Sequence, residues 1–113
     1  MKIQIQGIDE VVRDFELIGE KGEAFAKKVI QQAGADCQKR AKQFCPVDTG
    51  NLKRSIVWGL ADPFTALVVA GMEYAAYVEF GTRNMRPQPY MEYGFLWAEN
   101  NLEERLKEFK NEV

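Results

Sequence analysis

The stretch from Ala26 to Phe44 constrains the fold more than any other part of the sequence. Its apolar residues recur every three or four positions with a mean spacing of 3.6, which is the period of an α-helix. They are Ala26, Ile30, Ala33, Cys37, Ala41 and Phe44. The pattern predicts an amphipathic helix over residues 22–44, which Pro46 ends because proline disfavours helical geometry at the preceding residue. Because most of these side chains are small, we expect close packing against a sheet or a neighbouring subunit.

A second helical pattern runs through the last part of the sequence and predicts an amphipathic helix over residues 90–111. Its apolar residues are Phe95, Ala98, Leu102, Leu106, Phe109 and Val113. Shorter elements are expected before and between the two long helices. They are a strand over residues 2–6, a helix over 9–19, a β-hairpin with strands 55–60 and 64–70, and a short helix within 72–80.

Together these elements predict a single domain over residues 1–113 of the α+β class, with a short antiparallel sheet packed against two long helices. A chain of 113 residues is enough for one hydrophobic core. No run approaches the roughly 20 apolar residues that span a bilayer, and the first residues lack the apolar stretch of a signal peptide. We therefore expect a protein that is made in the cytoplasm and has no membrane partner.

The sequence contains no histidine, which excludes Ser-His-Asp triads, Cys-His dyads and histidine-containing metal sites. Cys37 and Cys45 are eight positions apart, about 12 Å along a helix, so reduced thiols are expected in place of a disulfide. The carboxylates of Asp62, Glu73 and Glu79 match the spacing of no carboxylate metal loop. We expect no catalytic residue, no metal and no cofactor.

The tripeptide Asp48-Thr49-Gly50 is the one segment that suggests chemistry, because retroviral-type aspartic proteases carry the same three residues. In those proteases the tripeptide follows an apolar strand, whereas here it follows a long helix. We interpret it as a structural turn, in which the side chain of Asp48 or Thr49 caps the next backbone N–H groups and Gly50 supplies permissive torsion angles. A protease with Asp48 as the catalytic residue is the remote alternative.

Charge is distributed unevenly along the chain. Residues 27–54 carry seven Lys and Arg against two Asp, a net charge of +5, whereas residues 1–24 and 92–112 each carry −3. A solvated helix face, charge complementarity between subunits and a DNA-binding module that uses the basic 27–54 segment are all consistent with this pattern. The aromatic residues of the middle of the chain have no Lys or Arg between Ser55 and Arg83, which favours core and subunit packing over nucleic-acid stacking.

Three segments in a fixed order carry a resemblance to a known family. They are Cys45-Pro46-Val47-Asp48-Thr49-Gly50-Asn51-Leu52-Lys53-Arg54-Ser55-Ile56, Tyr74-Ala75-Ala76-Tyr77-Val78-Glu79-Phe80-Gly81-Thr82 and Pro87-Gln88-Pro89-Tyr90-Met91. With Gly7-Ile8-Asp9-Glu10 near the start, this order resembles the tail-completion, or minor tail protein Z-like, family of tailed bacteriophages and prophages. One departure follows Met91, where the family commonly has a proline and small residues and this chain has Glu92-Tyr93-Gly94.

The resemblance implies a virion structural protein at the head–tail joint and no catalysis. It also implies a ring of copies of this chain that matches the sixfold symmetry of the tail. The expected partners are therefore other copies of the chain and other connector and tail proteins, with DNA only as passing cargo.

Two further expectations concern the segment around residue 81. Gly81 is expected to be a left-handed cap with positive φ at the end of the short helix. The loop that follows is expected to be an assembly surface, because its residue types are enriched at interfaces and its two prolines reduce the entropy lost on ordering. The proposed assembly contacts are Thr82, Arg83, Met85, Arg86 and Tyr90, and a plain solvent loop is the alternative.

Overall fold

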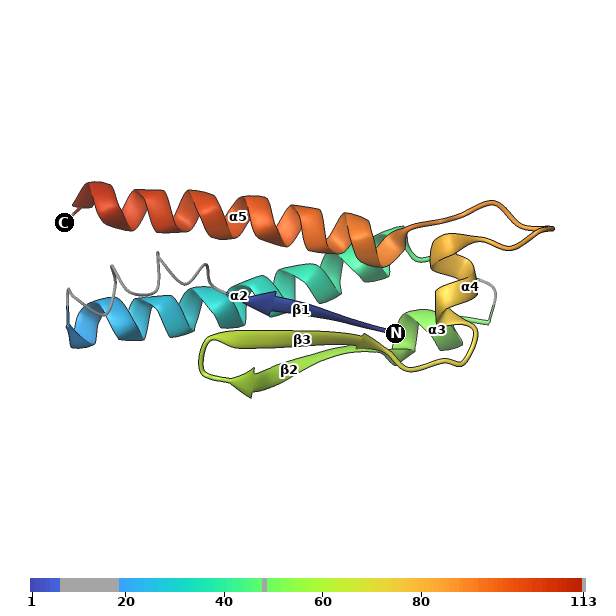
Figure 1. The fold of residues 1–113 in the computed structure, drawn as a ribbon, viewed down its shortest axis with the longest axis horizontal. Helices are drawn as coiled ribbons and strands as arrows, with labels where there is room; N and C mark the ends of the chain where they lie inside the picture. Colours follow the sequence, from blue (N-terminus) through green and yellow to red (C-terminus); the bar gives the residue numbers. More distant parts are fainter. Residues whose placement is uncertain (7–18, 48, 113) are drawn as a thin grey trace.

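A three-stranded antiparallel sheet and two long helices form the body of the structure (Figure 1). The computed structural model describes residues 1–6, 19–47 and 49–112. The body is elongated, with principal extents of 51 × 21 × 19 Å. This arrangement confirms the predicted α+β class, with a short sheet packed against long helices. The helix expected over residues 9–19 lies, apart from Gly19, outside the described residues.

The sheet has the strand order β1-β3-β2, so the two strands of the hairpin are neighbours and the first strand lies at an edge. Its strands are β1 (Lys2–Gln6), β2 (Ile56–Asp62) and β3 (Thr65–Ala70). In register, β3 pairs its Val69 with Lys2 on one side and with Val57 on the other. The hairpin turn lies at Pro63 and Phe64, slightly later than the sequence suggested, because β2 continues to Asp62.

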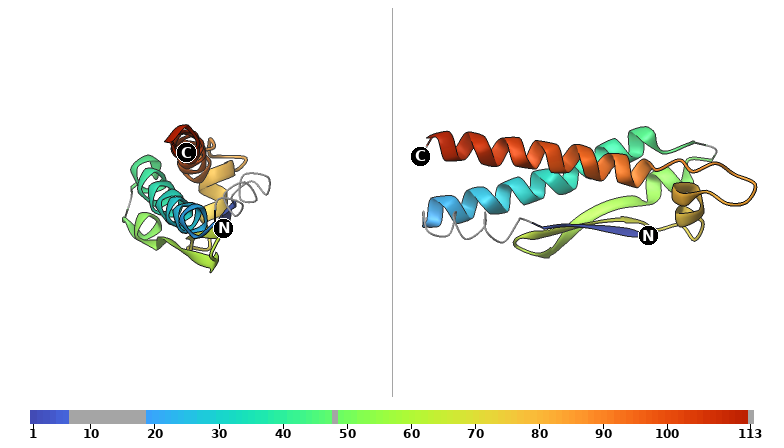
Figure 2. Two further views of the ribbon diagram at one scale, coloured as in Figure 1. Left: turned by 90° about the vertical axis from the view of Figure 1, so that its left-hand side faces the viewer. Right: turned by 45° about the horizontal axis from the view of Figure 1, so that its top comes forward.

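Helix α2 (Glu20–Phe44) covers one face of the sheet (Figures 1 and 2). Helix α5 (Tyr90–Glu112) packs against α2 and runs antiparallel to it. The small side chains of α2 permit close approach on both sides. A Cβ at Gly34 would lie 2.7 Å from the Trp58 ring of β2, and a Cβ at Gly94 of α5 would lie 2.7 Å from the carbonyl oxygen of Cys37. The close packing expected from the small apolar face of this helix is therefore made within the subunit.

Side-chain contacts fix the register between α2 and α5. The rings of Phe44 and Tyr93 meet edge to face, with centroids 5.2 Å apart. One turn further along, the Arg40 guanidinium lies 3.7 Å from the centroid of the Trp97 ring. Beyond them, the partly buried Asp36 and Arg105 form an ion pair with an Oδ2–Nη1 distance of 3.1 Å.

Two short helices lie at the end of the molecule where α2 ends and α5 begins (Figure 1). Helix α3 (Asn51–Ser55) follows the turn after α2 and leads directly into β2. Helix α3 was not predicted from the sequence, because its five residues are too few to show a helical period. Helix α4 (Ala75–Phe80) is the short helix predicted within residues 72–80.

Candidate assembly surface

The turn that precedes α3 is built by two of the residues that the sequence analysis selected. The hydroxyl oxygen Oγ1 of Thr49 accepts a hydrogen bond of 3.3 Å from the backbone N–H of Asn51. Gly50 has left-handed geometry, with φ 83° and ψ 0°, and α3 begins directly after it. Asp48 lies outside the described residues, so its role as a cap and the protease alternative both stay predictions.

Gly81 closes α4, because its backbone N–H donates to the carbonyl oxygen of Tyr77 at 2.9 Å. Its φ of 78° is positive, but its ψ of 172° places it outside the left-handed helical region, in a region that essentially only glycine occupies. A Cβ atom here would lie 2.7 Å from the backbone nitrogen of Pro87 and 2.8 Å from the carbonyl oxygen of Met85. Both the torsion angles and the space therefore require glycine.

Glu79 of α4 holds the start of α5. Its carboxylate oxygens accept hydrogen bonds from the backbone N–H groups of Met91, at 2.8 Å, and of Glu92, at 3.1 Å. These N–H groups belong to the first turn of α5, where the helix itself supplies no carbonyl partner. The residue is only 3% exposed, and the positive end of the helix dipole also favours a carboxylate there. Glu79 is thus a structural residue that joins the segments 74–82 and 87–91.

Tyr90 does not belong to the assembly surface, contrary to the sequence-based expectation. Its exposed fraction is 0%, and its hydroxyl donates a buried hydrogen bond of 3.1 Å to the carbonyl oxygen of Ala75. Burial raises the pKa of this phenol, as do the nearby Cys45 and Glu79. The expectation failed because Tyr90 is the first residue of α5 and its side chain already lies on the buried face of that helix.

Residues 82–89, which we call the arm, project from the end of the molecule beyond α4 (Figure 1). The tip is a tight turn in which Thr82 and Met85 exchange backbone hydrogen bonds of 2.9 and 3.2 Å. The returning half is fastened to α4, because the N–H of Gln88 donates to the carbonyl oxygen of Val78 at 2.9 Å. The arm therefore has a defined shape made by its own backbone.

The arm presents positive charge at its most exposed point. Arg83 and Arg86 are exposed, and neither forms an ion pair within the described part of the chain. Met85 lies between them with 36% of its surface exposed. Four of the five predicted contact residues are thus available on the arm, although contact itself remains a prediction.

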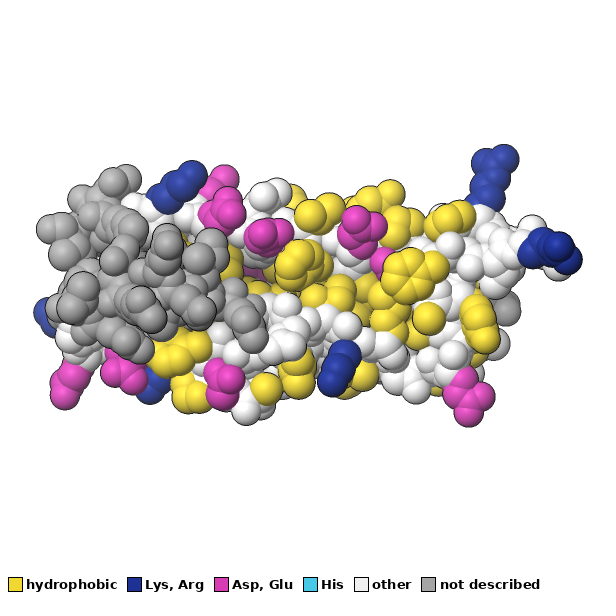
Figure 3. Space-filling view, in the orientation of Figure 1, with side chains coloured by type: hydrophobic (Ala, Val, Ile, Leu, Met, Phe, Trp, Pro, Cys, Tyr) yellow, Lys and Arg dark blue, Asp and Glu magenta, His cyan; other side chains and the backbone are white. Residues whose placement is uncertain are grey.

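Helix α4 and Tyr74, the residue that precedes it, carry three exposed aromatic side chains beside the arm, and we call these the α4 aromatic surface. Tyr74, Tyr77 and Phe80 are 39%, 62% and 70% exposed. Single exposed apolar residues are common, but several on one short helix indicate an interaction surface. Figure 3 shows hydrophobic side chains gathered at this end and along the seam beside α5.

A cleft of about 540 Å³ lies between the turn after α2, helix α4 and the arm. Thr49, Gly50 and Met85 are among the residues that line it, together with Tyr74 and Val78. The segments that carry the family resemblance are therefore brought together at one end of the molecule, although they are far apart in sequence. No titratable side chain lines the described part of this cleft apart from the phenol of Tyr74.

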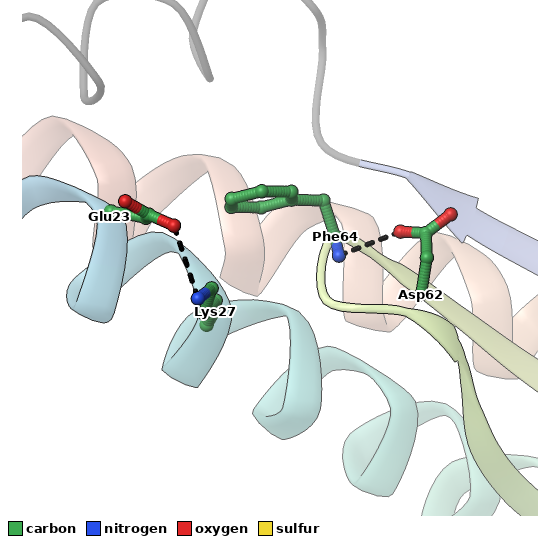
Figure 4. Close-up of polar contacts among 4 residues, drawn as sticks. All are labelled: Glu23, Lys27, Asp62 and Phe64. Carbon is green, nitrogen blue, oxygen red and sulfur yellow. Dashed lines mark hydrogen bonds and ion pairs between the residues drawn. The ribbon is translucent and has the colours of Figure 1, made fainter.

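Part of the basic segment 27–54 is engaged within the subunit. Lys27 forms an ion pair of 3.1 Å with Glu23, and its ammonium lies 6.0 Å from the centroid of the Phe64 ring (Figure 4). The backbone N–H of Phe64 in turn donates to Oδ1 of Asp62 at 2.8 Å, which forms the hairpin turn. The contact between Lys27 and the Phe64 ring joins the tip of the β-hairpin to the first turns of α2.

Three further lysines of α2, at spacings of seven and eleven, lie on one side of the helix. Lys21, Lys28 and Lys39 are exposed and form no ion pair in the described residues, and we call them the lysine stripe. Arg54 is engaged in the turn instead, where it donates to Oδ1 of Asn51 at 2.6 Å. DNA binding by the 27–54 segment stays a prediction.

Both cysteines are buried free thiols. Burial raises the pKa of Cys37 to about 12, and burial also raises the pKa of Cys45, with the charge of Lys53 opposing the rise. A thiol with a raised pKa is a poor nucleophile at neutral pH. Among the described residues, no three His, Cys, Asp or Glu side chains gather into a group that could hold a metal ion. None of the helices in the described part of the chain is long and apolar enough to cross a membrane.

A small α+β domain whose exposed aromatic residues and projecting arm gather at one end has the character of an assembly protein. The model of the family described as "Bacteriophage HK97-gp10, putative tail-component" matches residues 9–81, more than half of the chain. The chain belongs to this family of phage structural components, as its resemblance to phage tail proteins predicted. No curated protein and no solved structure matches it.

Proposed function

We propose that this chain is a non-enzymatic adaptor at the head–tail joint of a tailed phage and that its copies close into a ring, sixfold like the tail. The observation that carries the proposal is the α4 aromatic surface, where Tyr77 and Phe80 are 62% and 70% exposed beside the arginines of the arm. Exposed aromatic and arginine side chains at one site are typical of protein interfaces. Membership in a phage tail-component family supports a partner from the same virion.

The shape of the subunit also supports a ring. An arm at one end of an elongated body can reach a different surface of a neighbouring copy, which is a heterologous contact. Heterologous contacts close into a ring when the rotation that relates neighbouring copies is a whole fraction of a full turn. The same end could also meet the adjoining component of the joint, which would make the ring an adaptor.

Light scattering and negative-stain images of the purified protein test the ring directly. A Tyr77→Ser, Phe80→Ser variant should fold with a nearly unchanged melting temperature, because both side chains are exposed, but should lose the ring. Leu60→Ser is the matched control, since Leu60 is 45% exposed on the distant hairpin. If the double variant forms rings at wild-type yield, the interface between copies does not include α4.

A deletion of the gene in its phage or prophage tests the place in the virion. The expected result is separate heads and tails with no joined particles, restored by the wild-type chain and not by the Tyr77→Ser, Phe80→Ser variant. Normal joined particles without the chain would contradict a role at the joint, even if the purified protein formed rings.

A further inference from the structure

A shallow groove runs between β1 and α5 on the side of the molecule that Figure 3 presents. Two neighbouring hollows of about 340 and 400 Å³ form it, and Gln4 and Phe95 line both. Its apolar floor includes Ile3, Ile5 and Leu102. β1 is an edge strand of the described sheet, so the groove lies along an edge of that sheet.

The rim of this groove is acidic. Glu92, Glu99 and Glu103 of α5 line it at spacings of seven and four, which places them on one side of the helix. None of the three forms an ion pair within the described residues. Figure 3 shows acidic side chains following α5 directly above the hydrophobic seam. The groove is therefore complementary to a segment that brings an apolar side chain between positive charges.

We propose that the arm of one copy docks into the β1–α5 groove of the next copy. Arg83 and Arg86 supply two unpaired positive charges, and the partly exposed Met85 between them supplies a flexible apolar side chain. The inference rests on the proposed ring and names the two surfaces that would form it.

The arm cannot fill the groove of its own subunit. It projects away from the end of the molecule where α5 begins (Figure 1), whereas the α5 residues that line the groove extend back along that helix from Glu92 to Leu106. Contact between copies is therefore heterologous, and a heterologous contact is what a ring requires.

The lysine stripe of α2 is the other basic surface of the subunit, but it fits the groove less well. The exposed residues of α2 near Lys21, Lys28 and Lys39 include Ala24, Gln31 and Gln43, so the stripe brings no large apolar group to cover the groove floor. The arm is also the only one of the two that protrudes far enough to enter a hollow. The lysine stripe would contact the acidic rim of the groove and would not reach its apolar floor.

Charge reversal on both surfaces tests this docking. The arm variant, Arg83→Glu with Arg86→Glu, and the groove variant, Glu99→Lys with Glu103→Lys, should each remain at the monomer mass of 12.9 kDa. An equimolar mixture should restore the oligomer, because each variant's arm then matches the groove of the other. The wild-type oligomer should also dissociate as salt is added, since exposed charges are screened.

Lys28→Glu with Lys39→Glu is the control for charge, and it should assemble as the wild type does. Melting temperatures should stay close to that of the wild type in every variant, because all the replaced side chains are exposed. A single-chain variant with all four changes should assemble alone.

Three outcomes would overturn the inference. If the groove variant forms rings normally, the arm docks elsewhere, while the proposed ring function stands. If the mixture stays monomeric, the two surfaces do not meet. If the wild type itself is monomeric at every concentration, the groove receives a different protein, and the gene deletion described above then decides whether the joint function survives.

Cross-linking gives an independent readout. Met85→Cys with Glu99→Cys should form disulfides between copies under mild oxidation, since the native Cys37 and Cys45 are buried. The ladder of covalent oligomers should stop at the size of the closed ring. A Met85→Cys, Lys39→Cys pair should give far less cross-linking, and equal yields from both pairs would count against docking in the groove.

Discussion

The carboxylate of Glu79 accepts a hydrogen bond of 2.8 Å from the backbone N–H of Met91, and this contact fixes where the last helix begins. It ties α4 to α5 across the arm, so the two ends of the arm are held close together. The arm therefore projects from a closed base, and its position depends on a buried acid that is not part of it. Stability and assembly are linked through this residue.

Glu79→Ala should lower the free energy of unfolding by about 2 kcal/mol, because it leaves two N–H groups of the first turn without their buried acceptor. Glu79→Gln should cost less, since one oxygen remains. Glu73→Ala is the control, because Glu73 is exposed, and it should change stability by less than about 0.5 kcal/mol. Urea denaturation measures all three variants. Equal effects of the changes at 79 and 73 would contradict the capping role.

Gly81→Val should cost well over ~1 kcal/mol, because the Cβ would overlap the backbone at Pro87 and Met85 and the torsion angles suit only glycine. Gly59→Ala is a matched control in β2, where a Cβ meets nothing within 4 Å. It should be neutral or slightly stabilising, since it reduces the entropy of the unfolded chain. Thermal unfolding compares the two, and an unchanged melting temperature for Gly81→Val would remove the steric argument.

Periodicity predicted the long elements well, because each buries one face along its whole length. The helix expected over 22–44 is α2, and the one expected over 90–111 is α5, each within a few residues of its observed bounds. The hairpin was also predicted, with its turn displaced by about two residues, because β2 continues through Asp62 before the turn begins.

The sequence could not predict contacts between residues that are distant along the chain. Nothing near Glu79 shows that it caps a helix twelve residues later, since a capping box needs its acid within the same turn. Tyr90 was assigned to the assembly contacts for the same reason, because its neighbours in sequence are loop prolines while its ring belongs to the core. The acidic groove was also missed, since it forms only when β1 meets α5.

Gly94→Ala should destabilise the fold by roughly 1–3 kcal/mol, although the same change in an exposed helix would stabilise it by about 1 kcal/mol. The added Cβ would lie 2.7 Å from the carbonyl oxygen of Cys37 and 3.0 Å from the Cβ of Ala41, so α2 and α5 would have to separate. Asn100→Ala on the exposed side of α5 is the control and should be neutral or stabilising. A gain in stability for Gly94→Ala would mean that the helices are not in close contact here.

The stability of the protein should fall at high pH because of Cys37. Burial raises the pKa of this thiol from 9.0 to about 12, so its contribution is complete below about pH 9 and is lost as the pH rises toward 12. The stability difference between wild type and Cys37→Ala should therefore shrink above pH 9, by up to about 1.4 kcal/mol per pH unit. Urea denaturation of both proteins across this range measures it. A constant difference would show that the thiol ionises as easily in the folded state as in the unfolded chain.

Tyr90→Phe should lower stability by about 1 kcal/mol and leave assembly unchanged, because it removes one buried hydrogen bond to Ala75 and keeps the ring in the core. Tyr77→Phe is the matched control, since Tyr77 is 62% exposed on α4, and it should leave the free energy of unfolding unaltered. Denaturation and light scattering on the same samples separate the two effects. If Tyr90→Phe changed the oligomer mass and not the stability, the hydroxyl would be an assembly contact after all, and the arm would have to open from its base when copies meet.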